Sequence, residues 1–208
     1  MSTPIPLYQD DALLVVDKPA GLPSVPGRTP ELHDCMASRV QAAVPDALVV
    51  HRLDMATSGL LLFARGKAMQ RALSHAFAER TVDKRYIAVV AGRMAEDEGE
   101  ITLPLIADWP RRPLQKVDPE HGKPSLTRFK VLTRDARTTR VELTPLTGRS
   151  HQLRVHLLAI GHPILGDALY APPEVAVAAP RLLLHASGLV LRHPLNGSVL
   201  QVESPAPF

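Results

Sequence analysis

Short apolar runs divided by turn residues fill most of the sequence, a pattern typical of a protein built mainly from strands. Residues 140–144 alternate apolar and polar side chains, whereas residues 59–64 form one apolar run that predicts a buried strand. We expect strands at residues 12–16, 59–64, 84–90, 98–106, 126–132, 140–144, 182–184, 189–191 and 199–202.

Helices are fewer. Apolar residues at i, i+3, i+4, i+7 and i+8 from Met69 predict one amphipathic helix. Two more are expected at about residues 33–43 and 150–160, where a proline or a glycine follows the apolar pattern. Prolines and glycines make residues 19–30 an ordered surface loop, and residues 108–124 a polar, proline-broken insert.

The excess of strands joined by short turns predicts an α+β fold, with a largely antiparallel sheet and helices packed on it. The chain has 208 residues, enough for one ordinary domain or two small lobes. No repeat, low-complexity segment or long linker divides it.

Composition narrows the class of protein. Hydrophobic residues make up 45% and charged residues 22%, as in globular proteins. No stretch approaches the roughly 20 apolar residues that cross a bilayer, and the first residues carry no secretory signal. The single cysteine, Cys35, excludes an internal disulfide framework and fits a cytoplasmic location.

The positive charge is mostly arginine. Net charge is only +3, but 18 of the 24 basic residues are arginines. Arginine suits phosphate and base recognition, although a genome rich in GC would also favour it. The charge by itself therefore neither predicts nor excludes RNA binding.

A polar cluster at residues 51–54 lies between two apolar runs. Catalytic groups are often held on such loops. By residue type, Asp54 could be a nucleophile, a general base, a metal ligand or a turn residue before Thr57-Ser58-Gly59.

Several motifs together resemble the RluA family of pseudouridine synthases. The family signature is matched by His51-Arg52-Leu53-Asp54 with Thr57-Ser58-Gly59. Further matches in the expected order lie at residues 17–21, 84–86, 147–156, 161–167 and 181–186. The resemblance therefore covers nearly the whole chain. It implies a pseudouridine synthase fold with a central sheet in two lobes, flanking helices and an RNA-binding cleft, and it makes residues 1–208 one catalytic domain without an S4 RNA-binding module.

The resemblance also implies the catalytic residues. These enzymes detach uracil from its ribose and reattach it through carbon, and an aspartate forms a covalent intermediate. By position, Asp54 is that nucleophile. Arg149 is expected to pair with it and keep it ionised. Tyr86 is expected to stack on the uracil and to serve in proton transfer, although a tyrosine on a strand can also be a core residue.

Substrate contacts follow from the same motifs. Arg52 is expected to fill the place of the extruded nucleotide, with His51 and Thr57 beside it in the signature. Leu182 and Leu183 are expected to wall the uracil pocket, although a run of leucines is equally good core.

No cofactor and no metal are expected. The family chemistry needs neither, and the sequence contains no HExxH or CxxC pattern. His151 and His156 are five residues apart and share a helix face poorly.

Residues 24–28, Met55-Ala56 and 108–117 resemble the dual-specificity branch of the family, which modifies a uridine in the anticodon stem-loop of some tRNAs and one in a hairpin of 23S rRNA. Those RNAs are the expected partners, bound by a monomer without an obligate protein partner. Alternatives are a synthase for another tRNA or rRNA uridine, and an RNA-binding protein without catalysis. A two-carboxylate glycosidase would need a second acid in the motifs, and none lies there.

Overall fold

The structure, a computed structural model, describes residues 4–208, which divide into two compact units. The first unit comprises residues 4–84 and 185–207, and the second comprises residues 85–184 and Phe208. The chain leaves the first unit within β5 (Asp83–Ala91) and returns to it at the start of β11 (Leu184–Arg192).

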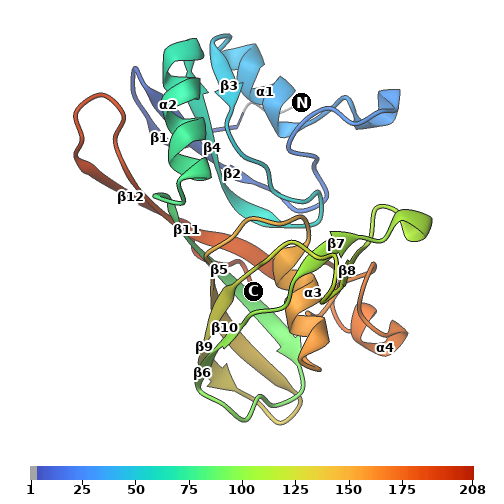
Figure 1. The fold of residues 1–208 in the computed structure, drawn as a ribbon. Helices are drawn as coiled ribbons and strands as arrows, with labels where there is room; N and C mark the ends of the chain where they lie inside the picture. The colour runs from blue at the N-terminus through green and yellow to red at the C-terminus, as the bar shows by residue number, and fades with distance from the viewer. Residues whose placement is uncertain (1–3) are drawn as a thin grey trace. The chain divides into compact units, whose positions relative to one another are not determined.

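The first unit is a sheet with two helices. Its strands are ordered β1-β2-β4-β11, with β3 paired to β4 and β12 paired to β11. Helix α2 packs on β3 and β4, and α1 packs on β3 (Figure 1). The continuous apolar run of β4 is buried along its length, as the sequence predicted. The elements are β1 (Pro6–Gln9), β2 (Leu13–Lys18), η1 (Pro30–Leu32), α1 (Met36–Ala43), β3 (Ala47–Val49), β4 (Ser58–Arg65), α2 (Gly66–Ala78), β11 and β12 (Val199–Glu203).

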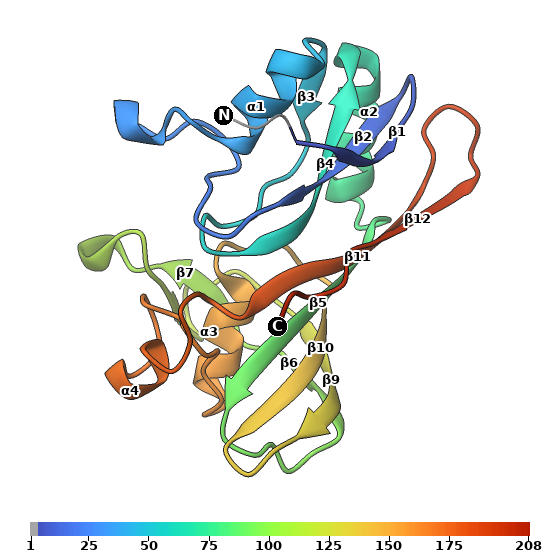
Figure 2. The same ribbon diagram turned by 180° about the vertical axis from the view of Figure 1, so that it is seen from behind.

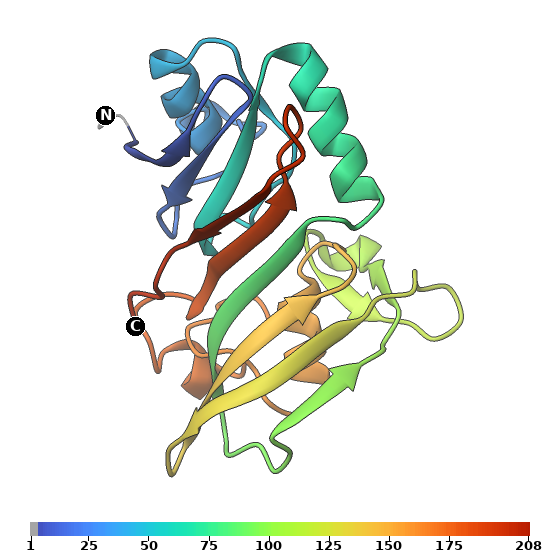
Figure 3. The same ribbon diagram turned by 90° about the vertical axis from the view of Figure 1, so that its left-hand side faces the viewer.

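The second unit has a four-stranded antiparallel sheet, ordered β5-β10-β9-β6, whose long strands lie side by side in Figure 3. Helix α3 packs on β9 and β10, and a separate two-stranded hairpin is formed by β7 and β8. The elements are β5, β6 (Glu98–Ile101), β7 (Leu105–Ala107), η2 (Trp109–Arg111), β8 (Gln115–Val117), β9 (Thr127–Arg134), β10 (Thr138–Pro145), α3 (Gln152–Ala159) and α4 (Pro173–Ala176).

The predicted α+β class and the mostly antiparallel sheet are confirmed. One pairing differs: β4 and β11 run parallel, with Ser58 opposite His185 and Gly59 opposite Ala186. A close approach explains the glycine, because a Cβ on Gly59 would lie 2.3 Å from the carbonyl oxygen of Ala186.

Three predicted boundaries were wrong. The strand expected at residues 98–106 is two strands, because residues 102–104, which include Pro104, lie outside both strands, and β7 pairs with β8 rather than with β9. The strands expected at 182–184 and 189–191 form one strand, β11, because the intervening residues stay in the sheet: His185 and Ala186 pair with β4, and Gly188 to Arg192 pair with β12. Helix α3 begins at Gln152 rather than Ser150, because His151 has a left-handed backbone (φ 55°).

Candidate active site

The predicted site residues are divided between the two units. The first unit holds the signature residues His51, Arg52, Asp54 and Thr57. The second unit holds Tyr86, Arg149, Leu182 and Leu183.

Lys18 and Ser24 hold the Asp54 loop from a distant part of the sequence. Lys18 is fully buried, and its ammonium donates to the carbonyl oxygens of Leu22 at 2.7 Å and Met55 at 3.1 Å, and also to that of Pro19 at 2.9 Å. The Ser24 hydroxyl donates to the carbonyl of Leu53 at 2.7 Å and accepts from its N–H at 3.0 Å. Hydrogen bonds on both sides of Asp54 therefore fix its backbone.

His51 holds the start of the same loop. Its Nε2 accepts the backbone N–H of Leu62 at 2.9 Å, and its ring stacks on Phe77 of α2 with centroids 4.6 Å apart. Desolvation, and then the positive charge of Lys84, lower the pKa of His51 to about 3. The ring is therefore neutral at physiological pH, as an acceptor from a backbone amide must be.

The remaining signature residues differ in exposure. Arg52 is exposed, and within residues 4–208 it has no ion pair or hydrogen bond from its guanidinium. Asp54 is half-buried, and its carbonyl accepts the N–H of Thr57 at 3.1 Å in a tight turn. Thr57 itself is buried. Arg52 and, in part, Asp54 are thus accessible to solvent, whereas Thr57 is buried and His51 is bonded to the backbone of Leu62.

A buried polar chain stabilises the strand that follows. Ser58 Oγ lies 2.8 Å from Nδ1 of His185, whose Nε2 lies 3.0 Å from Oγ of Ser204. The Ser204 hydroxyl donates to Asp17 at 2.6 Å. These contacts join β4 to β11 and β2 within the first unit.

Tyr86 lies on β5 opposite Leu143 of β10. Because side chains alternate along a strand, Tyr86 shares a sheet face with the fully buried Ala88 and Val90. Tyr86 is half-buried. Along β5, burial on this face of the sheet therefore decreases from Val90 and Ala88 towards Tyr86.

A glutamine sets the Arg149 loop. Gln152 is buried, and its Oε1 accepts from the Thr147 hydroxyl at 2.7 Å and from the Arg149 N–H at 3.0 Å. Its Nε2 donates to the Leu126 carbonyl and to Thr127 Oγ1, both at 3.0 Å. The Arg149 side chain is half-buried, with Nε 3.3 Å from the Pro124 carbonyl.

His151 and His156, the two histidines considered as metal ligands, contact different groups. His156 is fully buried between Thr127 on one side and Ser125 and the Leu103 carbonyl on the other. Burial lowers its pKa. His151 Nδ1 lies 2.5 Å from the Tyr170 hydroxyl. Both rings are thus engaged in holding the second unit together.

Leu182 and Leu183 follow a close backbone crossing. Leu183 donates its N–H to the Leu165 carbonyl at 3.0 Å, and its own carbonyl accepts from Val89 at 3.2 Å. A Cβ on Gly166 would lie 1.8 Å from the Arg181 carbonyl oxygen, so only glycine fits there. Leu182 is buried and Leu183 half-buried, so Leu183 is the more available as a pocket wall.

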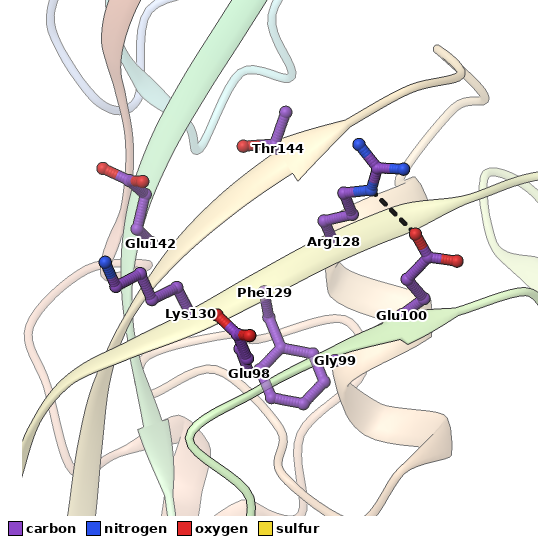
Figure 4. Close-up of a pocket in the computed structure, with 8 residues that line it drawn as sticks. All are labelled: Glu98, Gly99, Glu100, Arg128, Phe129, Lys130, Glu142 and Thr144. Carbon is purple, nitrogen blue, oxygen red and sulfur yellow. Dashed lines mark hydrogen bonds and ion pairs between the residues drawn. The ribbon is translucent and has the colours of Figure 1, made fainter.

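A hollow on the second unit is lined by none of the predicted site residues. Figure 4 shows Arg128 bonded to Glu100 across β9 and β6, with Lys130, Glu98 and Glu142 beside them. Lys130 stands opposite both Glu98 and Glu142, so opposite charges alternate across the strands. This balance is typical of a solvated sheet face. The lining is Glu98, Gly99, Glu100, Arg128, Phe129, Lys130, Glu142 and Thr144.

The described residues offer neither a metal site nor a membrane-spanning helix. Residues 4–208 contain no group of three His, Cys, Asp or Glu side chains placed to hold a metal ion. Within the same residues, no helix is both long and apolar enough to cross a membrane.

Lys18, Ser24 and Gln152 are the residues whose roles the sequence did not reveal. Lys18 was visible as a lysine at the end of an apolar run, and Gln152 as an amide beside a predicted helix start. Neither signal specifies which carbonyl or N–H the side chain will meet, since those partners come from other segments.

Comparison with known proteins decides the family. Residues 12–159 match the family described as RNA pseudouridylate synthase, which is more than half of the chain. The chain belongs to this family. It is an RNA pseudouridine synthase, an enzyme that isomerises uridine in RNA, as the motifs predicted.

Relatives match nearly end to end. The dual-specificity RNA pseudouridine synthase RluA of Yersinia pestis is 55% identical over 205 residues, covering 98% of this chain and 100% of that protein. Its namesake from Escherichia coli K12 is 54% identical over 203 residues, covering 97% and 93%. Among solved structures, human RNA pseudouridylate synthase domain containing 1 is similar with a TM-score of 0.81 and 31% identity, covering 97% of this chain and 82% of that one.

Proposed function

We propose that this synthase acts on two kinds of RNA, the anticodon stem-loop of certain tRNAs and a hairpin of 23S rRNA, with Asp54 as its nucleophile. The observation that carries the specificity is the 54–55% identity, over almost the full chain, to proteins named dual-specificity synthases. The two RNAs themselves follow from the motif resemblance to that branch of the family.

Asp54 as nucleophile is supported by the way its loop is built. Lys18 and Ser24 fix the backbone on both sides of Asp54, which fixes the point from which its side chain projects. Holding a reacting group in a fixed geometry is a large part of catalysis. In the proposed reaction the carboxylate forms a covalent bond to the ribose or the uracil ring, and the bond between ribose carbon 1 and uracil nitrogen 1 breaks. Carbon 5 then bonds to the ribose, the bond to the carboxylate breaks again, carbon 5 loses its proton and nitrogen 1 ends protonated, so that the free carboxylate is restored.

The other roles come from the matched motifs and the local exposure. The exposed Arg52 guanidinium is the proposed wedge that replaces the flipped nucleotide. Tyr86 is the proposed stacking and proton-transfer residue. Arg149 is the proposed cationic partner of the reacting carboxylate, with its backbone set by Gln152. His51 and Thr57 are proposed to support the substrate-binding loop, and Leu182 and Leu183 to line the uracil pocket.

Release of tritium from RNA labelled at uracil carbon 5 tests the proposal. We expect wild type to release tritium from both an anticodon stem-loop and a 23S hairpin. Asp54→Asn should lower the rate by roughly four orders of magnitude or more, as loss of a nucleophile does in other enzymes. The matched control is Asp11→Asn, an exposed aspartate, which should keep wild-type activity.

Release from only one of the two RNAs would rule out dual specificity and support the alternative, a synthase for a single tRNA or rRNA uridine. Full activity in Asp54→Asn would rule out the nucleophile. The cytoplasmic location and the monomeric state stay predictions.

A further inference from the structure

The tip of the β7–β8 hairpin exposes an aromatic ring and two arginines together. Residues 109–113 are all exposed, and Trp109, the only tryptophan of the chain, is 66% exposed. Figures 1 and 2 both show the hairpin and its η2 turn projecting from the side of α3. A tryptophan left in water forgoes the burial that usually stabilises such a ring, so its position calls for a partner.

The tip is ordered by its own hydrogen bonds. Asp108 and Leu114 bond across the base, with the Asp108 N–H 2.9 Å from the Leu114 carbonyl. The Arg111 N–H donates to the Asp108 carbonyl, and the Leu114 N–H donates to the Arg111 carbonyl, both at 3.0 Å. Because the loop is already ordered, a ligand would not have to order it on binding.

A second set of contacts anchors the hairpin to the body of the unit. The Tyr170 hydroxyl accepts the N–H of Gln115 at 2.9 Å, directly after the tip. The guanidinium of Arg154 lies 5.0 Å from the centre of the Tyr170 ring and is held by the buried carboxylate of Asp167. The tip therefore stands on a rigid base.

The charge of the tip is positive on its exposed side. Arg111 is 72% exposed even though it is paired with Asp108, whose side chain is buried. The Arg112 guanidinium lies over the Trp109 ring, and within residues 4–208 no carboxylate pairs with it. Residues 109–113 contain no acidic residue. An aromatic ring beside two guanidinium groups suits a nucleobase and its phosphate.

We infer that the tip formed by Trp109, Arg111 and Arg112 is a second RNA-binding site, in which an unpaired nucleobase stacks on Trp109 and the arginines meet its phosphates. The inference rests on the proposed function only in taking RNA as the partner. Since the chain's net charge is only +3, local sites of this kind contribute much of the attraction to RNA.

The single tryptophan makes the site directly observable. An unlabelled anticodon stem-loop is titrated into wild type while tryptophan emission is recorded, and filter binding with the same RNA, radiolabelled, gives an independent affinity. We expect quenching of Trp109 emission that follows the filter-binding curve, because stacking on a base quenches indole.

Substitutions of Trp109 and Arg112 measure how much each side chain contributes to RNA binding. Trp109→Ala should weaken binding about 5- to 150-fold, the range for loss of one stacked base, and Trp109→Phe should lose less. Arg112→Gln should reduce the salt dependence of binding by about one phosphate contact. The controls are Val177→Ala and Arg128→Gln, exposed side chains elsewhere in the second unit, which should bind as wild type does.

Each outcome decides one question. RNA that binds without changing Trp109 emission, together with unchanged affinity of Trp109→Ala, overturns the inference. Quenching and weakened binding without tritium release from wild type uphold the inference and refute the proposed function for that RNA. Absence of binding by both methods overturns both. Equal melting temperatures of the variants and wild type show that an affinity change is local.

Discussion

The Asp54 loop and the Arg149 loop are held in place in different ways. The Asp54 loop is held by side chains from far away in the sequence: Ser24 lies 29 residues from Leu53, and Lys18 lies 37 residues from Met55. The Arg149 loop is organised by Gln152, which lies three residues from Arg149 and accepts its N–H, and whose amide nitrogen also ties the loop to Leu126 and Thr127. Lys18 and Ser24 both reach the Asp54 loop from a distant segment, whereas the Arg149 loop combines a contact from its own neighbour with contacts to one distant segment.

The largest expected effect is the loss of stability on removing the buried ammonium of Lys18. Lys18→Met leaves three carbonyl groups without their donor, and we expect a loss of about 3–5 kcal/mol in the free energy of unfolding. Urea denaturation measures it. The exposed Lys130→Met should change stability by less than about 0.5 kcal/mol, and an equal loss in both variants would show that Lys18 has no special role.

The corresponding change in the other loop is Gln152→Leu, which keeps the volume and removes four hydrogen bonds. We expect a loss of about 2–4 kcal/mol in the free energy of unfolding and a lower kcat for tritium release. Gln201→Leu, at an exposed position, is the control. Wild-type kcat in a folded Gln152→Leu enzyme would mean that the Arg149 loop keeps its shape without the amide.

Ser24→Ala tests the two hydrogen bonds that hold the backbone of Leu53, the residue before Asp54. It removes two buried hydrogen bonds to Leu53 and should cost about 1–3 kcal/mol. If Ser24 positions the nucleophile, kcat falls while KM for RNA stays near wild type. Ser198→Ala, an exposed serine, should leave both constants unchanged. A rise in KM alone would assign Ser24 to RNA binding instead.

The effect of His51 is the smallest at neutral pH, because it appears only in acid. Its pKa is lowered from 6.5 to about 3 in the folded protein, so between these values the unfolded chain binds more protons and stability falls as the pH falls. His51→Gln can still accept from Leu62 and does not titrate. Its melting temperature should therefore drop less than that of wild type between pH 7 and pH 4.

His156 also has a lowered pKa and contributes to the same acid dependence. The comparison is therefore made between His51→Gln and wild type, both of which keep His156. Parallel melting curves for these two proteins across that pH range would show that His51 titrates normally in the folded state.

The sequence by itself determined the kind of protein. The apolar run of β4, the amphipathic stripe of α2 and the alternation of β10 follow from the period of each element. The motifs around Asp54, Tyr86 and Arg149 carry the family, which the comparisons confirm, because their order along the chain is a property of the sequence alone.

Only the tertiary structure decided which groups hold those motifs in place. Lys18 meets the Met55 carbonyl and Ser58 meets His185 because β2, β4 and β11 are neighbours in one sheet, and neither partner is signalled in the residues nearby. The exposure of Trp109 was equally hidden, since an aromatic residue in a proline-broken insert predicts neither burial nor projection. Local pattern fixes the elements, whereas buried hydrogen bonds depend on which segments the fold brings together.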